Sequence, residues 1–497
     1  MRVPITFQEL LRGVDVLTTA EFDQAVTGLH YDSRQIKPGN IFVCIQGYRT
    51  DGHLYIQDAV SRGAAGLVVE KDLNVSPGVP FVRVNSSRLA LALMAANFYG
   101  HPSRNLTLIG VTGTNGKTTT THLIESVLRG RGESTGIIGT IWNKIGKQRF
   151  PVVRTTPESL DLQSILAKMN ASMVKTVSME VSSHALYLQR VAACEFDVGV
   201  YTNLTQDHLD FHADLDEYLA AKMLLFEGLG MARTKERPCY AVVNIDDPAA
   251  QRIIKCTRVP VITYGIHEQA DVKAKSVQLT SEGSSFTVVL SKGDFPISTS
   301  LPGEFNIYNS LAAISVGLRE GIPVTVIRDA LQKMKGVPGR FELVDEGQKF
   351  TVVIDYAHTP DGLENVLKTA RGISRGRLIT VFGCGGDRDA VKRPVMGMIS
   401  GEMSDYTVIT SDNPRSEAPE KIEYQIEDGI RKIGNAHYTI ITDRYQAIRH
   451  ALLYAKEGDF VVIAGKGHET YQIIGDNVFP FDDHQVAREI LVKEIGV

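Results

Sequence analysis

The sequence has few of the residues and runs that mark several protein classes. It contains five cysteines and one tryptophan in 497 residues, and no two cysteines form a C-x-x-C pair. Neither a disulfide framework nor a cysteine-based zinc knuckle fits this spacing, so we expect a reducing compartment. No run of about eighteen apolar residues occurs, and the opening MRVPITFQELLRG lacks the apolar core of a signal peptide. We expect a soluble, cytoplasmic protein without membrane insertion.

An excess of charge of one sign is also missing. Lys and Arg total 53 and Asp and Glu total 57, which gives a formal net charge of -4. Binding to nucleic acid requires a clustered basic excess, so we expect small-molecule substrates and no nucleic acid. The 43% hydrophobic and 22% charged residues are typical of a globular chain. At roughly 150 residues per domain, the length predicts about three domains. We expect a monomer.

The order of apolar and polar segments predicts three α/β domains. Residues 1–102 alternate short apolar runs with helical stretches and end at a His-Pro-Ser linker. Residues 103–336 open with an apolar strand and include a period-two segment at 259–301, which predicts antiparallel strands. Residues 337–497 follow a cluster of turn residues and alternate strands with helices. This alternation predicts a doubly wound, Rossmann-like sheet.

A glycine-rich motif, GVTGTNGKTT, occupies residues 110–119 between a predicted strand and the predicted helix Lys117–Arg129. Glycines at such a turn let backbone N–H groups approach phosphate oxygens, while Lys117 reaches the outer phosphates and the Thr118 hydroxyl binds Mg²⁺. Position 111 is valine, where the strict pattern has glycine. The motif predicts a P-loop ATPase-like central domain. Its predicted ATP-binding residues are Gly113, Thr114, Asn115, Gly116, Lys117, Thr118 and Thr119.

Other segments of the central domain offer metal ligands. Glu180 ends an apolar strand, where P-loop enzymes supply a carboxylate, although a glutamate at a strand end is more often a surface residue. Residues 202–212 add oxygens and imidazoles, and the lack of a cysteine ligand favours Mg²⁺ over zinc. Lys222 shares the apolar face of the predicted helix Asp216–Leu229 with Tyr218. A lysine there must snorkel, pair or change its charge.

Four polar motifs directly follow predicted strands of the last domain. They are DYAHTP, GCGGDRD, SDNPR and GKGHE, after the strands at 350–355, 377–382, 406–410 and 460–464. Ligands of doubly wound sheets bind at the carboxyl ends of the strands, so we expect the four loops to face one site. In isolation, the Asn-Pro pair of the third motif is also typical of a surface turn.

Together these motifs resemble those of the Mur ligase family, which uses ATP to form amide bonds in peptidoglycan precursor assembly. The resemblance covers essentially the whole chain, with the family's GxxGTNGKT loop at Gly110–Thr118. It implies catalytic roles for Lys117, Glu180, His208 and Lys222, and Mg²⁺ binding by Thr118, Glu180, His208 and Lys222. In the family the lysine that matches Lys222 is carbamylated, which turns a buried cation into a carboxylate. This explains a buried lysine better than snorkelling does.

The resemblance also implies the remaining binding residues. ATP would further contact Asn306, Asn309, Arg340 and Asp355. The UDP-sugar peptide would bind an N-terminal UDP-binding domain and part of the central domain, at Ser33, Thr155, Thr156, Ser182 and Arg190. Diaminopimelate would bind at Arg388, Asp412, Asn413, Pro414, Arg415, Gly465 and Glu469. The DNPR motif resembles the signature of members that add meso-diaminopimelate, because an arginine can pair bidentately with the carboxylate that lysine lacks.

The implied activity is ATP-dependent addition of meso-diaminopimelate to UDP-N-acetylmuramoyl-L-alanyl-D-glutamate through an acyl phosphate, which gives ADP and phosphate. Closure of the last domain is expected to complete the ATP site. Three alternatives are a folylpolyglutamate synthase-like ligase, a P-loop ATPase switch or motor, and a non-catalytic nucleotide-binding module. A folylpolyglutamate synthase has no uridine domain or DNPR motif, both of which are expected here. A switch or motor is disfavoured because the last domain carries four polar strand-end loops, more than a switch needs. A non-catalytic module is disfavoured because it does not require four residues that are all present here, namely Lys117, Thr118, Glu180 and Lys222.

Overall fold

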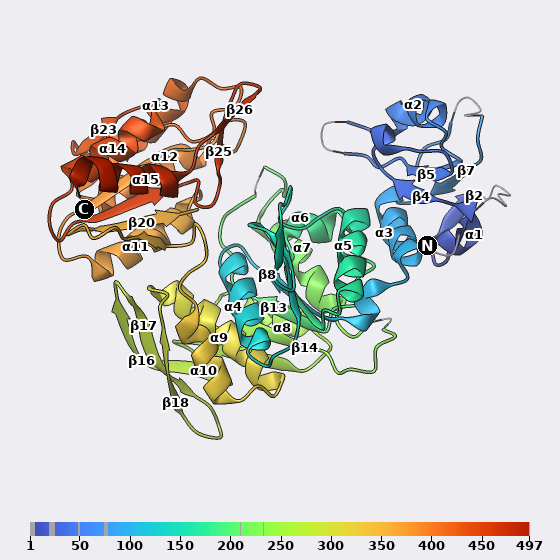
Figure 1. Cartoon of the computed structure of the whole chain (residues 1–497), viewed down its shortest axis with the longest axis horizontal. Coiled ribbons are helices and arrows are strands. Elements are labelled where there is room, and N and C mark those ends of the chain that lie inside the picture. Colours follow the sequence, from blue (N-terminus) through green and yellow to red (C-terminus); the bar gives the residue numbers. More distant parts are fainter. Residues whose placement is uncertain are drawn as a thin grey trace.

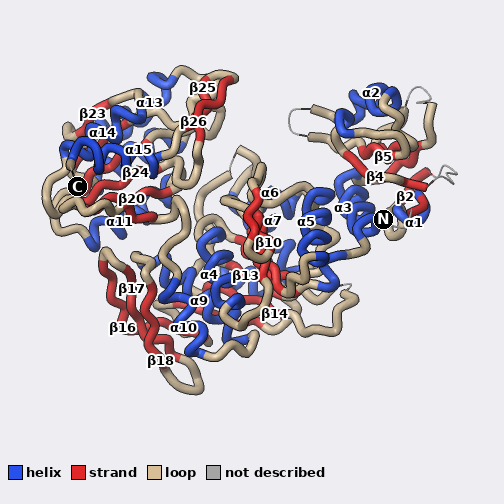
Figure 2. The backbone as a smooth tube through the Cα atoms, in the orientation of Figure 1, coloured by secondary structure: helices blue, strands red, loops and turns tan. Residues whose placement is uncertain are grey.

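The computed structural model describes residues 5–18, 25–47, 50–73, 78–208, 210–231 and 233–496. Figure 1 shows three lobes in chain order, with the blue N-terminal lobe at one end and the orange and red C-terminal lobe at the other. Helices and strands occur together in every lobe (Figure 2), which confirms the predicted α/β class. Among the described residues, no helix combines the length and the apolar character that crossing a membrane requires.

The N-terminal lobe contains a five-stranded sheet with the order β2-β7-β6-β5-β4, in which β2 runs antiparallel to its neighbour. Its elements are β1 (Ile5–Thr6), α1 (Phe7–Leu10), β2 (Val16–Thr18), β3 (Ala25–Val26), β4 (Gly28–His30), β5 (Asn40–Val43), α2 (Ile56–Ser61), β6 (Gly66–Val69), β7 (Phe81–Val84) and α3 (Ser87–Tyr99). The His-Pro-Ser segment that follows forms a 3-10 turn, Pro102–Asn105, with Pro102 and Ser103 buried.

The central lobe is built on an 11-stranded sheet with the order β11-β10-β9-β12-β8-β13-β14-β15-β16-β17-β18. Its strands are β8 (Thr107–Thr112), β9 (Thr135–Ile138), β10 (Asn143–Ile145), β11 (Gln148–Phe150), β12 (Thr176–Glu180), β13 (Val198–Tyr201), β14 (Tyr240–Asn244), β15 (Val261–Gly265), β16 (Val272–Thr280), β17 (Gly283–Val289) and β18 (Phe295–Thr299). Its helices are α4 (Lys117–Arg129), α5 (Ser159–Ala171), α6 (Ser183–Tyr187), α7 (Leu215–Glu227), α8 (Ala250–Cys256), α9 (Glu304–Arg319) and α10 (Val324–Lys333).

Two sequence predictions for this lobe need correction. Strand β15 pairs in parallel with β14, so the prediction of antiparallel strands is wrong for residues 261–265. Strand β17 is antiparallel to both of its neighbours, β16 and β18. Helix α7 begins at Leu215 and ends at Glu227, not at Asp216 and Leu229. It begins there because the Asp214 carboxylate accepts the Glu217 backbone N–H at 2.8 Å and caps the helix.

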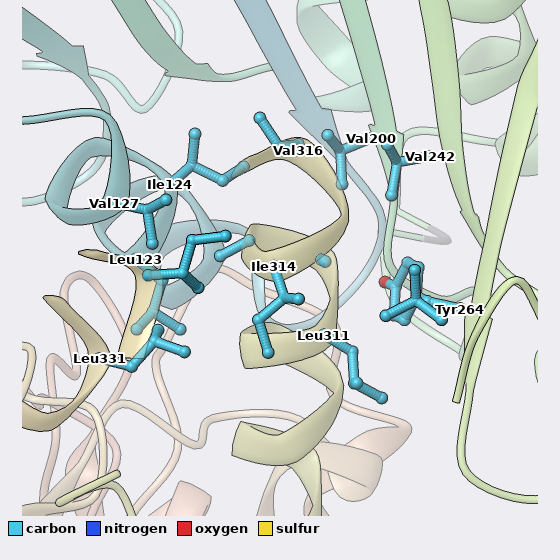
Figure 3. Close-up of a cluster of buried hydrophobic side chains, with 14 of the residues drawn as sticks. Leu123, Ile124, Val127, Val200, Val242, Tyr264, Leu311, Ile314, Val316 and Leu331 are labelled. Atoms are coloured by element: carbon cyan, nitrogen blue, oxygen red, sulfur yellow. The ribbon is translucent and has the colours of Figure 1, made fainter. Parts of the chain in front are cut away.

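The core beside the glycine-rich loop lies between the central sheet and helices α4, α9 and α10. Figure 3 shows Leu123 and Val127 of α4 facing Leu331 of α10, with Ile314 of α9 between them and the sheet. A second buried cluster, including residues of α5, α7 and α8, covers the opposite face of the sheet. Helix α4 is therefore fixed by packing along its length, which sets the position of the loop at its N-terminus.

The C-terminal lobe contains a six-stranded sheet with the order β19-β20-β24-β21-β22-β23, parallel except for β19. Its strands are β19 (Glu342–Val344), β20 (Thr351–Asp355), β21 (Leu378–Phe382), β22 (Tyr406–Ile409), β23 (Tyr438–Ile440), β24 (Phe460–Ala464) and the hairpin β25 (Tyr471–Ile474) and β26 (Asn477–Pro480). Its helices are α11 (Pro360–Ile373), α12 (Lys392–Met403), α13 (Pro419–Lys432), α14 (Arg444–Tyr454) and α15 (Asp483–Ile490). Helices α11, α12 and α13 pack on one face and α14 and α15 on the other, which confirms the doubly wound arrangement.

Direct contacts join the lobes. The Tyr31 hydroxyl of the N-terminal lobe donates to the Asp161 carboxylate of α5 at 2.7 Å. On the other side, Phe305 of α9 and Phe341 of the C-terminal lobe have ring centroids 6.0 Å apart. The strand-end loops of the C-terminal sheet are thereby held beside the central lobe.

Candidate functional site

The glycine-rich loop joins β8 to α4, as its motif predicts. Gly113 and Gly116 have φ angles of 151° and 81°, in the region that favours glycine. A Cβ atom on Gly113 would collide with the Thr202 hydroxyl, and one on Gly116 would collide with the Asn309 side chain. Backbone conformation and close neighbours therefore both require glycine at these positions.

Lys117, the first residue of α4, folds its side chain back over the loop. Its Nζ donates to the carbonyl oxygens of Gly113 and Thr114 at 2.9 and 2.7 Å. Burial lowers the pKa of Lys117, and Glu180 opposes that shift by favouring the charged form. A phosphate in the loop would give this ammonium a charged partner in place of two neutral carbonyl groups.

Thr118 connects α4 with two other parts of the chain. Its hydroxyl donates to Glu180 Oε2 at 2.9 Å and accepts a hydrogen bond from the Arg340 guanidinium at 3.1 Å. The Oε1 atom of Glu180 accepts the Thr140 backbone N–H at 2.7 Å. Thr140 is not among the predicted site residues, because no motif surrounds it. A hydroxyl and a carboxylate thus lie side by side next to the loop.

Lys222 is buried on α7, with 1% of its surface exposed. Its Nζ lies 3.9 Å from the centroid of the Tyr218 ring and donates to the Gly113 carbonyl oxygen at 2.9 Å. Burial, followed by the nearby Lys117 ammonium, lowers the pKa of Lys222 well below its ordinary value. The side chain therefore reaches the glycine-rich loop rather than solvent, and the snorkelling interpretation is wrong.

His208 lies in the loop after β13, with its ring centroid 4.8 Å from that of His184. Burial lowers the pKa of His208, and Asp207, whose Oδ2 atom lies 3.3 Å from Nε2, acts in the opposite direction. Leu209, within the predicted 202–212 segment, lies outside the described residues. Over the described ranges of the chain, no group of three or more His, Cys, Asp or Glu side chains is arranged to hold a metal ion.

One asparagine of α9, Asn309, lies against the glycine-rich loop, and a second, Asn306, supports it. Asn309 accepts a hydrogen bond from the Thr120 hydroxyl at 3.0 Å and donates to the Asn306 side-chain oxygen at 3.0 Å. Asn306 in turn donates to the Pro302 carbonyl oxygen at 2.8 Å. The structure thus brings Asn309 to the loop from a segment almost two hundred positions away, and Asn306 lies behind Asn309 and contacts it directly.

Arg340 and Tyr356 connect this loop to the strand-end loops of the C-terminal sheet. The Arg340 guanidinium carbon lies 4.5 Å from the centroid of the Tyr356 ring. The Tyr356 hydroxyl donates to Glu469 Oε1 at 3.5 Å. Because Arg340 also contacts Thr118, a continuous set of side chains runs from α4 to the loop after β24.

Two aspartates of the DYAHTP segment and the helix after it have different roles. The Asp355 carboxylate accepts the backbone N–H groups of Phe341 and Ala357 at 2.6 and 2.7 Å, and burial raises the pKa of Asp355 to about 6. Asp361 accepts a hydrogen bond from the Asn115 side chain of the glycine-rich loop at 2.5 Å. Asp361 is a further contact between lobes that sequence analysis missed.

The loops after β21 and β22, two of the four expected to face one site, pack against each other. Arg415 donates to the Gly386 carbonyl oxygen at 2.8 Å, and a Cβ atom on Gly386 would overlap the Pro414 carbonyl group. Arg388 is exposed on the first of these loops. Burial, followed by the charge of Arg388, lowers the pKa of Arg415. Two guanidinium groups thus lie near each other at this edge of the sheet.

The loops after β22 and β24 meet through polar side chains. Asn413 donates to Glu469 Oε2 at 2.9 Å, and a Cβ atom on Gly465 would crowd the Asp412 carboxylate. Lys466, between Gly465 and Glu469, is fully buried. Lys466 is not among the predicted site residues, because nothing in a polar glycine-rich motif indicates burial of its lysine.

The residues predicted to hold a UDP-sugar peptide lie in two places. The Thr156 hydroxyl donates to Ser182 Oγ at 3.3 Å, and Arg190 donates to the Thr156 carbonyl oxygen at 3.2 Å. Thr155 precedes Thr156 and accepts a hydrogen bond from Thr140 at 3.1 Å. Ser33 lies in the N-terminal lobe, at the start of the 3-10 turn Ser33–Gln35.

Comparison with protein-family models divides the chain into three matched segments. Residues 25–99 match the model described as "Mur ligase family, catalytic domain", residues 111–317 match "Mur ligase middle domain", and residues 339–467 match "Mur ligase, glutamate ligase domain". The three segments correspond in order to the three lobes of Figure 1.

Similar proteins extend over nearly the whole chain. A UDP-N-acetylmuramoyl-L-alanyl-D-glutamate–2,6-diaminopimelate ligase of Geobacillus thermodenitrificans is 51% identical, covering 94% of this chain and 95% of its own. A protein of the same name from Syntrophomonas wolfei is 48% identical, covering 97% and 98%. A solved structure, also of a protein of that name, is 32% identical with a TM-score of 0.69 and covers 100% of both chains.

Proposed function

The chain belongs to the Mur ligase family, and from this premise we propose that it joins meso-diaminopimelate to UDP-N-acetylmuramoyl-L-alanyl-D-glutamate in an ATP-dependent reaction of peptidoglycan precursor biosynthesis. The observation that carries the proposal is the contact of Arg340 with both Thr118 and Tyr356. Through Glu469, which contacts Tyr356 and Asn413, it links the start of α4 to the GKGHE and DNPR loops. The names of the full-length relatives support the same substrates.

ATP would bind at the glycine-rich loop. Lys117 would exchange its two carbonyl partners for phosphate oxygens, and the N-terminus of α4 would add positive potential. Asn306, Asn309, Arg340 and Asp355 would complete the nucleotide site from α9 and from the C-terminal lobe. Since groups from two lobes would contact ATP, their relative position would decide whether the site is complete.

In the first step, the D-glutamate side-chain carboxylate would attack the γ-phosphorus of ATP, and the bond to ADP would break. The products are an acyl phosphate and ADP. Lys117 and Arg340 would offset the charge that develops on the transferred phosphoryl group. Thr155, Thr156, Ser182 and Arg190 would hold the peptide end of the UDP-sugar substrate, with Ser33 at its nucleotide end.

In the second step, the diaminopimelate amine would attack the acyl carbon, pass through a tetrahedral intermediate and release phosphate with loss of a proton. Arg415 would bind the distal carboxylate and Glu469 the ammonium group at the same end, while Arg388 would help to hold the two ends of the amino acid. Asp412, Asn413, Pro414 and Gly465 would shape this pocket. Most of the rate gain would come from the fixed alignment of amine and acyl phosphate.

Mg²⁺ fits the donor set of the site. Thr118 and Glu180 offer a hydroxyl and a carboxylate, the ligand types that Mg²⁺ takes together with substrate phosphates, and His208 lies in a neighbouring loop. Mg²⁺ would supply further charge neutralisation at the phosphates. An ammonium at Lys222 does not fit there, whereas a carbamate does. Burial favours the neutral amine of Lys222, which can add to CO₂ and lose a proton.

We assign residues 1–102 to UDP binding, 103–336 to ATP binding and 337–497 to amino-acid binding. The 3-10 turn at Pro102–Asn105 and the glycines at 336 and 339 support these limits. We also propose that the protein is a monomer and that it works in the cytoplasm, where its nucleotide substrates would be small soluble molecules.

Phosphate release from ATP tests the function. The protein should release phosphate when both UDP-N-acetylmuramoyl-L-alanyl-D-glutamate and meso-diaminopimelate are present, and far more slowly with L-lysine as acceptor. Phosphate release without either substrate would favour a P-loop switch. Use of a folate and glutamate instead would favour the folylpolyglutamate synthase-like alternative, which the full-length relatives do not support.

A further inference from the structure

Lys466 is a buried cation that the proposed mechanism does not use. None of its surface is exposed. Its Nζ lies 3.3 Å from Asn413 Oδ1 and 3.4 Å from Glu469 Oε2, and 5.6 Å from the centroid of the Tyr471 ring. Burying an ammonium is costly unless it is paired, so its position demands a charged partner. Glu469 provides that partner.

Lys466 also fixes the geometry of a three-residue unit. Asn413 accepts from Lys466 with Oδ1 and donates to Glu469 Oε2 with Nδ2 at 2.9 Å. The same Asn413 oxygen accepts the Ile473 backbone N–H at 2.9 Å. The amide orientation of Asn413 and the carboxylate orientation of Glu469 are therefore both set by contacts that include Lys466.

We propose that Lys466 is a positioning residue for the acceptor amino acid, because its ammonium holds Asn413 and Glu469 in a fixed orientation. The proposal rests on the proposed function, in which Glu469 binds the ammonium group at the distal end of diaminopimelate. Lys466 would act through Glu469 and would not itself touch the reacting atoms.

Charge makes the role of Lys466 specific. Burial and then the Asp412 carboxylate raise the pKa of Glu469, whereas Lys466 and the Asn413 hydrogen bond lower it. The charged and titratable groups that face Glu469 are Asp412, Lys466, Arg415, Arg444, Tyr356 and Tyr471. Removal of Lys466 leaves burial and Asp412 with less opposition. The pKa of Glu469 then rises further. As the pH is lowered, Glu469 therefore becomes protonated, and loses its hold on a cationic acceptor group, at a higher pH than in the parent.

The test compares the parent protein with Lys466→Met, which keeps much of the side-chain volume without charge, and with Lys466→Arg, which keeps the charge. Saturation curves for meso-diaminopimelate, ATP and UDP-N-acetylmuramoyl-L-alanyl-D-glutamate are measured from pH 6 to 9. We expect Lys466→Met to raise the half-saturating diaminopimelate concentration about tenfold or more, the size of one lost charge-assisted interaction. In the same variant, the acidic limb of the pH profile of kcat/KM for diaminopimelate should move to higher pH. Lys466→Arg should restore much of the parent's half-saturating concentration and of its pH profile.

The values for ATP and the UDP-sugar peptide should stay within about threefold of the parent. Lys432→Met, at the exposed end of α13, is the matched control and should match the parent. If Lys466→Met does not fold, Lys466→Gln takes its place, since glutamine can still donate to Asn413 and Glu469. An unchanged diaminopimelate curve and pH limb in the neutral variant would overturn the proposal. A parent that does not use diaminopimelate at all would instead overturn the proposed function.

Discussion

The Arg340 guanidinium donates to the Thr118 hydroxyl over 3.1 Å, although 222 positions of sequence separate the two residues. The contact connects the first turn of α4 to the segment that leads into the C-terminal sheet. Thr118 also donates to Glu180, so one hydroxyl accepts a hydrogen bond from a guanidinium and donates one to a carboxylate. Bound phosphate would compete for both partners.

Arg340→Ala should weaken ATP binding. We expect the half-saturating ATP concentration to rise about ten- to hundredfold, since a charge-assisted contact contributes roughly 1.5–3 kcal/mol. Saturation kinetics with ATP measure the effect, and Arg375→Ala, at an exposed position, is the control. An ATP curve that matches the parent would remove Arg340 from the nucleotide site.

Lys117→Ala should abolish ligation, because the loop loses the only ammonium that its own motif supplies to the outer phosphates. Amide formation is measured by product analysis, with Lys168→Ala on the exposed side of α5 as the control. Near-normal product formation by the variant would show that the phosphates bind elsewhere.

Lys222→Ala should be nearly inactive and partly rescued by short carboxylic acids, which can occupy the place of a carbamate. The reason is the burial of Lys222 beside Gly113, where an ammonium would repel a metal ion. Activity is measured with and without acetate, and exposed Lys255→Ala is the control. An active parent in which intact mass analysis finds only unmodified Lys222 contradicts this expectation.

Asp355 should make the folded protein less stable as pH rises. Its pKa is raised from 3.8 to about 6, so between these values the unfolded chain ionises while the folded carboxyl stays protonated. The contribution of Asp355 to the free energy of unfolding then falls by up to about 3 kcal/mol across this window and is constant above it. Thermal unfolding from pH 4.5 to 7 should show the parent losing stability relative to Asp355→Asn.

Exposed Asp345→Asn is the control for this comparison and should keep a constant difference from the parent. The stability difference between the parent and Asp355→Asn could instead stay constant from pH 4.5 to 6. That result would mean that Asp355 ionises normally in the folded protein.

Arg415→Ala should raise the half-saturating concentration of diaminopimelate by about ten- to hundredfold, because a bidentate carboxylate pair is lost. The ATP and UDP-sugar curves should stay within a few-fold, since those sites lie in other loops. The three saturation curves are compared with those of Lys421→Ala, an exposed change in the same lobe. Equal use of L-lysine by the parent, or an unchanged diaminopimelate curve in the variant, would exclude DNPR as the element that reads the acceptor.

The sequence by itself determined the features that depend on neighbouring residues. The predicted helix Lys117–Arg129 has the observed bounds of α4, because glycine conformation and apolar periodicity act over a few positions. The strands that precede the four polar motifs were located for the same reason, with no end shifted by more than one residue. The parallel pairing of β15 could not be read from its own pattern, since a strand's direction depends on which strand it meets.

Tertiary structure alone decided how distant side chains meet. Lys222 could be placed on an apolar helix face, but its contact with Gly113 depends on how α7 packs against the loop. Nothing local marks Lys466 as buried or Tyr356 as the link between Arg340 and Glu469. Such contacts arise because strand order and helix packing bring together chain segments that have no local interaction, and only the folded chain fixes that order.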